Sequence, residues 1–371
     1  MSGEVSKLIR ESRIIVCCGA GGVGKTTTSG AIAIAGARMG RRVLVLTIDP
    51  SKRLAEALGV ERNPPAPVAL KEDRLRSVGI NPPGTLDAWM LDPKLIADQE
   101  VRAIVKDPKD VEKLLQNRIY KHVTTMVAGM HEYTAMQALH RFVLSGRYDL
   151  VVLDTPPSRH ALDFLEAPGR LSRFLDGRIF KMFMPQEHVG GLRRAAGSIV
   201  SRVLGGVLGE QFASDLSVFF GVFSGVLSTL NRDVSGMRDF LSQPDVAFLL
   251  VTSPAPAALE EALFFQKKTD ELKLPFRGFV LNRSHAYDEG RQFPNDAIFA
   301  NETIPRSSIE KLQILAESER SLIARDQELV RDLGRRAGVG GFATALPVLL
   351  PHETEMKKLE SLANQLMSAD I

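Results

Sequence analysis

The chain has 371 residues, of which 25% are charged, and its formal net charge is +3. This length allows one large α/β domain or two smaller ones, each with a sizeable core. A net charge this small, without a block of like charges, argues against nucleic acid as a partner.

The N-terminal segment is polar and mixed in charge, without the apolar segment of a secretory signal. We therefore expect a cytosolic protein, and peripheral association with a membrane stays open. The two cysteines, Cys17 and Cys18, are adjacent in an apolar run. They are predicted to be small buried residues of a core strand rather than metal ligands or a disulfide.

The first predicted strand, at about 14–18, leads into a glycine-rich loop and a helical run. Gly19, Gly24, Lys25 and Thr26 fit the pattern G-x-x-x-x-G-K-[ST], which in this context is typical of a phosphate-binding loop. Its backbone N–H groups and the helix N-terminus attract phosphate, the lysine reaches the β and γ phosphates, and the threonine hydroxyl can bind Mg²⁺. The predicted nucleotide-binding residues are Gly21, Gly22, Val23, Gly24, Lys25, Thr26 and Thr27.

Two further predicted strands, at about 43–48 and 150–153, are each followed by an aspartate. Asp154 is a candidate for holding Mg²⁺ through water. Alone it would be explained as a turn residue or helix cap, but beside the loop the metal role is favoured. Asp49 is a candidate for orienting or deprotonating the attacking water, or else part of an Asp-Pro turn, and spacing does not decide between them.

The other apolar runs predict strands at about 87–91, 246–252, 278–281 and 344–349, which makes about seven in all. Helical stretches separate them, as in βαβ units. The predicted fold is an α/β P-loop NTPase with a mostly parallel twisted sheet flanked by helices.

Strand patterns are absent from two stretches, at about 92–144 and 160–242. They predict a helical subdomain inserted into a single P-loop ATPase domain, 1–371. The apolar run at 218–230 is too short to cross a bilayer. An apolar groove for a hydrophobic helix is one interpretation of the large residues here, and packing against one another is the favoured default. These residues are Phe180, Met182, Phe183, Phe219, Phe220, Phe223 and Leu227.

Six motifs together carry a resemblance to a known family: GAGGVGKTTTS, DPSKRL, GMHEYTAM, DTPPSRHALDFLEAPGRL, VLNR and LLPHE. The chain resembles, over nearly its whole length, the arsenite-transporting and tail-anchored-protein-targeting ATPases. These are ArsA-like members of the deviant P-loop class. The long motif that begins at Asp154 is more specific than the phosphate loop alone.

The resemblance implies an ATPase that uses ATP/ADP and Mg²⁺, in which two subunits face each other and nucleotide-driven closure controls a cargo. Asp49 would lie in switch I as the water-activating residue, and 154–160 would form switch II. Asn282 would pair its amide with the adenine edge, and Pro351 would mark a late loop that packs over the base.

The sequence also departs from the family pattern. The lysine that reaches the partner's nucleotide in this class is replaced by Ala20, so hydrolysis by this chain alone is expected to be slow. Lys52, Arg53 or Arg159 could substitute for it. Because the chain has no cysteine besides Cys17 and Cys18, a metalloid-gated pump is disfavoured, and zinc is not expected.

Three hypotheses follow. The first is a dimeric, Mg²⁺-dependent ATPase that controls binding or targeting of a hydrophobic or membrane-protein cargo. The second is a weakly hydrolysing regulatory subunit that pairs, as a heterodimer, with an ArsA-like paralogue carrying the signature lysine. A positioning ATPase of the ParA or MinD type has the least support, because those proteins generally keep that lysine.

Overall fold

The structure is a computed structural model. It describes residues 3–48, 53–60, 64–121, 130–155, 215, 218–219, 222, 239–286, 305–349 and 354–368.

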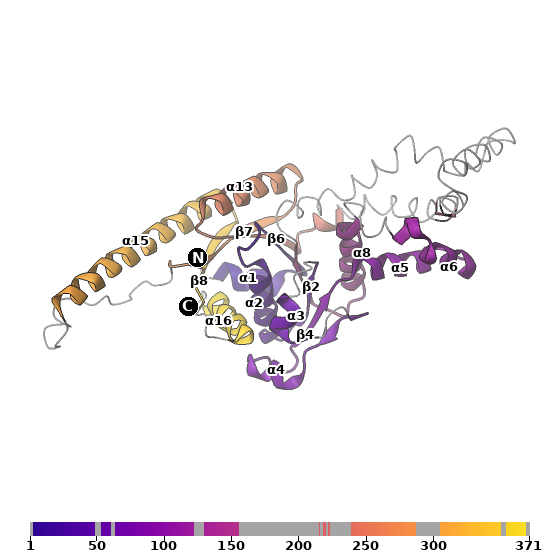
Figure 1. Ribbon diagram of the computed structural model, residues 1–371, viewed down its shortest axis with the longest axis horizontal. Helices are drawn as coiled ribbons and strands as arrows, with labels where there is room; N and C mark the ends of the chain where they lie inside the picture. The colour runs from indigo at the N-terminus through magenta and orange to yellow at the C-terminus, as the bar shows by residue number, and fades with distance from the viewer. Residues whose placement is uncertain are drawn as a thin grey trace. The chain divides into compact units, whose positions relative to one another are not determined.

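Helices and strands alternate along most of the chain (Figure 1). In chain order the elements are α1 (Gly3–Glu11), β1 (Ile14–Cys18), α2 (Lys25–Arg38), β2 (Arg42–Thr47), α3 (Arg53–Leu58), β3 (Val68–Ala69), α4 (Glu72–Ser77), β4 (Thr85–Met90), α5 (Pro93–Ile104), α6 (Pro108–Gln116), α8 (Met130–Leu144), β5 (Leu150–Asp154), β6 (Val246–Thr252), α13 (Pro256–Glu271), β7 (Phe276–Ser284), α15 (Arg306–Ala337), β8 (Phe342–Pro347) and α16 (Glu355–Ser368).

The strands form one eight-stranded sheet in the order β3-β4-β2-β5-β1-β6-β7-β8. Every neighbouring pair is parallel except β3 with β4. Strand β1 lies between β5 and β6, so the loop that follows β1 opens at the carboxyl edge of the sheet's centre, where α/β folds bind ligands. The predicted α/β class with a mostly parallel sheet is confirmed.

Continuous apolar runs explain the central strands. Every residue of β1, β5 and β6 is buried, as expected where helices cover both faces of a parallel sheet. Each predicted strand is present: the ranges 14–18 and 246–252 match, and the ends of the others are shifted by up to three residues. The described residues contain eight strands, one more than predicted, because the two-residue strand β3 follows a proline-rich segment and lies antiparallel at the sheet edge.

Helices cover the sheet in two groups (Figure 1). Helices α13 and α15 lie near β6, β7 and β8, and the Gln266 side chain of α13 donates a hydrogen bond to the Arg336 carbonyl of α15. Helices α1, α2 and α16 share an apolar core with alternate side chains of the central strands, including Ile15 and Cys17. The helix that begins at the phosphate loop is therefore held between the sheet and α16.

The chain divides into two compact units. Unit 1, which contains the sheet, comprises Met1–Met90, Arg147–Arg159 and Pro244–Ile371, and unit 2 comprises Leu91–Gly146 and His160–Gln243. In unit 2, α5 and α6 each begin with an Asp-Pro pair in which the aspartate side chain accepts backbone N–H groups of the first turn. The helical subdomain predicted at 92–144 and 160–242 is described mainly over its first stretch.

Of the apolar residues proposed for a cargo groove, Phe219 is buried in unit 2. The other six lie outside the described residues, so both interpretations of this set stay predictions.

Candidate nucleotide-binding site

The phosphate loop connects β1 to α2, as the motif predicts. Gly24 caps the helix in a left-handed conformation, with φ of 94° and ψ of 27°. A Cβ atom on Gly24 would come within 2.1 Å of the Asn282 side-chain nitrogen. Glycine is thus required there both by the backbone and by the close approach of β7.

The first turn of α2 is suited to an anion. It contains no acidic residue, and its N-cap supplies no side-chain hydrogen bond. The backbone N–H groups at this end carry partial positive charge and have no partner within the helix. Gly21 and Gly22, just ahead of the helix, are exposed. These features together suit the loop to binding a phosphate group.

Lys25 is 5% exposed, and its ammonium group points back into the loop. Nζ donates hydrogen bonds to the carbonyl oxygens of Gly19, at 2.9 Å, and Ala20, at 2.8 Å. The two carbonyls compensate part of the cost of burying the charge. The sequence motif placed Lys25 in the loop but did not indicate these contacts.

Asp154 is fully buried at the end of β5, and two threonine hydroxyls donate to its Oδ2 atom. The Thr26 hydroxyl lies at 2.8 Å and the Thr47 hydroxyl, at the end of β2, at 2.9 Å. The two predicted magnesium-binding residues therefore meet. Sequence reasoning missed Thr47, for which the available signal was a hydroxyl near the end of an apolar run, two residues before Asp49.

The donor set around Asp154 fits magnesium. Carboxylate and hydroxyl oxygens are the hard ligands that this ion takes beside phosphate. Here Thr26 Oγ1 and Asp154 Oδ2 are already in contact at the N-terminus of α2. Thr26 would hold the metal directly and Asp154 through water, beside a phosphate held by the loop.

Asn282 on β7 also reaches the loop. Its side chain is 5% exposed, and Nδ2 donates a hydrogen bond to the Val23 carbonyl oxygen at 2.8 Å. The structure therefore shows the Asn282 amide bonded to the phosphate loop, and its contact with adenine stays a prediction. Pro351, the other residue predicted near the base, lies outside the described residues.

Several predicted site residues cannot be placed in the same way. Asp49 and two candidate replacements for the missing lysine, Lys52 and Arg159, lie outside the described residues, as does the side chain of Arg53. The residue before Asp49, Ile48, donates its backbone N–H to the Asp154 carbonyl at 3.2 Å.

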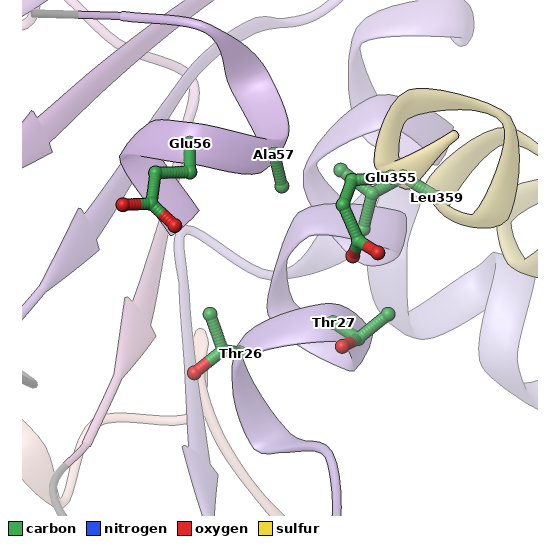
Figure 2. A pocket seen from close by; sticks show the side chains of 6 residues that line it. All are labelled: Thr26, Thr27, Glu56, Ala57, Glu355 and Leu359. Carbon is green, nitrogen blue, oxygen red and sulfur yellow. The ribbon is translucent and has the colours of Figure 1, made fainter. Parts of the chain in front are cut away.

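A pocket of about 410 Å³ opens beside the loop (Figure 2). Thr26 and Thr27 of α2 lie on one side, and side chains of α3 and α16 form the rest of its lining. These are Glu56, Ala57, Glu355 and Leu359. The two glutamates were not predicted, because they follow no motif and come together only when α16 packs on α2.

Both cysteines are fully buried in β1, as predicted. Burial raises the pKa of both thiols, that of Cys18 to about 12. A thiol reacts as the thiolate, so these two are inert in the folded protein.

The comparison with protein families identifies the chain. The sequence model of the anion-transporting ATPases of the ArsA type matches residues 12–297, which contain the loop, Asp154 and Asn282. The chain belongs to this family.

Individual ArsA-type relatives match at moderate identity. An uncharacterized protein of Streptomyces coelicolor is 28% identical over 289 residues, which cover 76% of this chain and 63% of that protein. The arsenical pump-driving ATPase of Escherichia coli is 32% identical over 164 residues, 43% of this chain and 26% of that protein. The ATPase get3 of Schizosaccharomyces pombe is 25% identical over 250 residues, 66% of each chain.

This ArsA-type chain thus spans from about a quarter to about two thirds of the length of these relatives. Within its described residues, no helix has both the length and the apolar character that a membrane span requires.

Proposed function

We propose that this ArsA-type protein is a dimeric, Mg²⁺-dependent ATPase that uses ATP binding and hydrolysis to control the binding or targeting of a hydrophobic or membrane-protein cargo. The observation that supports it best is the meeting of Thr26 with Asp154 at the N-terminus of α2, beside the buried Lys25. Phosphate, metal and catalytic cation would all be held where the loop and the first turn of α2 meet the end of β5.

Lys25 would change partners when nucleotide binds. Its Nζ atom now donates to the carbonyls of Gly19 and Ala20. A phosphate oxygen is a better acceptor for a buried ammonium, because both groups are charged. We expect Lys25 to turn from these carbonyls to the β and γ phosphates, which lets the loop close on the nucleotide.

Thr26 and Asp154 would hold magnesium, the aspartate through water. Bound magnesium neutralises charge on the phosphate oxygens and orients them. The Thr47 hydroxyl, 2.9 Å from Asp154 Oδ2, keeps the carboxylate directed toward Thr26. Asp49 would then orient and deprotonate the attacking water, while Asn282 and Pro351 would contact the adenine base.

Similarity to named members of the family supports the proposed dimer and cargo. Relatives carry the names arsenical pump-driving ATPase and ATPase get3. We propose that two subunits close on their nucleotides and that unit 2 transmits this closure to a hydrophobic helix. The apolar residues at 180–183 and 219–227 are its proposed contacts.

A second candidate function is favoured by Ala20. Its side chain is 7% exposed and packs in the apolar core of unit 1, and its carbonyl accepts from Lys25. The position that would carry a lysine directed at a partner's nucleotide thus holds a buried methyl group. A regulatory subunit would accept that lysine from a paralogue in a heterodimer.

Fluorescent mant-ADP titrated into the purified protein, with and without Mg²⁺, tests the proposal. We expect magnesium-dependent binding that weakens about ten- to a hundredfold in Lys25→Ala, because a charge-assisted bond is lost. Lys113→Ala, an exposed lysine of unit 2, serves as the matched control and should bind like wild type. Absence of binding by wild type would refute the ATPase assignment.

Steady-state hydrolysis separates the two candidates. An ATPase that works alone hydrolyses ATP as a homodimer and loses hydrolysis, but not binding, in Asp49→Asn. A regulatory subunit shows little turnover until a paralogue with the signature lysine is added, and Ala20→Lys should raise its own rate. Vigorous turnover by the homodimer would refute the regulatory assignment.

A further inference from the structure

Helix α15 contains a buried carboxylate that belongs to no motif. Asp326 is 0% exposed, although charged residues surround it along the helix. Each of its two carboxylate oxygens accepts two hydrogen bonds. Arg325 donates to Oδ1 from two nitrogens, at 2.9 and 2.7 Å. The Ser284 hydroxyl, at 3.2 Å, and the His285 backbone N–H, at 2.8 Å, donate to Oδ2.

The donors to Oδ2 come from the end of β7, immediately after an irregularity in the strand. The pairing of β7 with β8 shifts register between Leu281 and Ser284. Within this shift, Arg283 has a φ of 56°, in the left-handed region that non-glycine residues rarely adopt. Such a conformation persists only where neighbouring contacts hold it. The bonds from Ser284 and His285 to Asp326 are such contacts.

Asn282 lies on the other side of the same irregularity. In a regular strand the side chains of Asn282 and Ser284 would point to the same face. Here one donates to the Val23 carbonyl of the phosphate loop and the other to Asp326 of α15. Bulges re-aim side chains in this way, often beside functional sites.

We propose that Asp326 is a positioning residue for the nucleotide site: by fixing the end of β7 beyond Arg283, it holds the Asn282 amide against the phosphate loop. This inference rests on the proposed function, because it concerns the affinity of that site for nucleotide. Asp326 acts through Asn282 and touches neither the loop nor the nucleotide.

The alternative is that Asp326 only stabilises the fold, and a double-mutant cycle separates the two. The affinity for mant-ADP with Mg²⁺ is measured in wild type, Asp326→Asn, Asn282→Ala and the double variant. An asparagine keeps the shape but turns one acceptor into a donor that faces existing donors. We expect Asp326→Asn to weaken binding about tenfold. In the Asn282→Ala background the same change should have no further effect.

Urea unfolding of the same four proteins measures stability, which a purely structural role of Asp326 would also change. Asp326→Asn should lower the unfolding midpoint in both backgrounds, whereas its effect on affinity should require Asn282. Asp87→Asn is the matched control, because Asp87 is a buried carboxylate of β4 that accepts from Arg147 and Tyr148. It should lower stability and leave the affinity unchanged.

Provided that wild type binds nucleotide, two outcomes would overturn the positioning role. One is an equal loss of affinity from Asp326→Asn with and without Asn282, and the other is no loss in either background. If wild type itself binds no mant-ADP, the proposed function fails and this inference fails with it. If Asp326→Asn does not fold, Ser284→Ala replaces it in the cycle, because it removes one donor and leaves the carboxylate with Arg325 and His285.

Discussion

The Thr26 hydroxyl donates a 2.8 Å hydrogen bond to Asp154 Oδ2 across 128 residues of sequence. The contact brings the start of α2 against the end of β5, next to the parallel pairing of β1 with β5. Thr47 donates to the same oxygen, so the buried Asp154 carboxylate is held in one orientation.

Neutralising this carboxylate should separate stability from metal dependence. An asparagine keeps one oxygen that can accept from Thr26 and Thr47, so we expect Asp154→Asn to leave the ligand-free protein folded, with a melting temperature near that of wild type. The further increase in melting temperature given by ADP with Mg²⁺ over ADP alone should disappear. Differential scanning fluorimetry measures both. Asp149→Asn, just before β5 and half exposed, should retain the Mg²⁺ effect, and its loss there would contradict the assignment.

Alanine at two glycines of the phosphate loop should differ in effect. Gly22 and Gly24 both have positive φ, but a Cβ on Gly22 meets nothing within 4 Å, whereas one on Gly24 meets the Asn282 side chain. Gly22→Ala should therefore cost only backbone strain, about 1–2 kcal/mol of unfolding free energy. Gly24→Ala should cost more and weaken nucleotide binding.

Asn282→Ala removes the group that the new methyl would strike, so the double variant Gly24→Ala/Asn282→Ala should recover part of the stability. Chemical unfolding of the four proteins measures this recovery. Strict additivity of the two changes would show that the clash is not what makes Gly24 necessary.

The buried thiols predict an alkaline loss of stability. The unfolded cysteines ionise near pH 9, while burial raises the pKa of folded Cys18 to about 12 and that of Cys17 at least as strongly. Between these values the unfolded chain holds fewer protons, so stability falls as pH rises. Each thiol should shift the folding equilibrium about tenfold per pH unit.

The unfolding free energy of wild type, compared with that of Cys17→Ala/Cys18→Ala from pH 8 to 10.5, isolates this contribution from other groups. A parallel pH dependence in the two proteins would contradict it. Thiol labelling at pH 8 should likewise be slow in the folded state and fast in urea.

A smaller effect is expected in acid. The Arg42 guanidinium lowers the pKa of Asp149 to about 2, from 3.8 in the unfolded chain. The stability this pair gives is present above pH 3.8 and is lost as the pH falls toward 2. Between pH 3.8 and 2, the urea midpoint of Arg42→Ala should therefore fall less than that of wild type. Both partners are substantially exposed, so added salt should reduce the difference.

Local patterns were sufficient for the sheet and the loop. The runs at 14–18 and 246–251 are apolar throughout, and their short length and polar flanking residues favour fully buried strands over helices. The contact of Thr26 with Asp154 was implied because the phosphate-loop threonine and the aspartate after the strand at 150–153 were both predicted to bind Mg²⁺. Strand β3 was missed because two residues beside prolines are too few to show the alternation of apolar and polar residues that predicts a strand.

The contacts behind the loop could not be predicted, because they depend on which strands become neighbours. Asn282 ends an apolar strand, but its bond to Val23 requires β7 to lie two strands from β1. Asp326 gave one signal, a carboxylate seven residues before the buried Leu333 on the same face of α15. Helical periodicity marks such a residue as unusual but does not name its partner.

The position of β1 also bears on synthesis. The strand that carries the loop, Ile14–Cys18, pairs on one side with Leu150–Asp154 and on the other with Val246–Thr252. A growing chain therefore exposes its most apolar early strand until both partners have left the ribosome, and long-range pairing of this kind is slow. Nascent chains that end before residue 246 should lack nucleotide binding and should depend on chaperones.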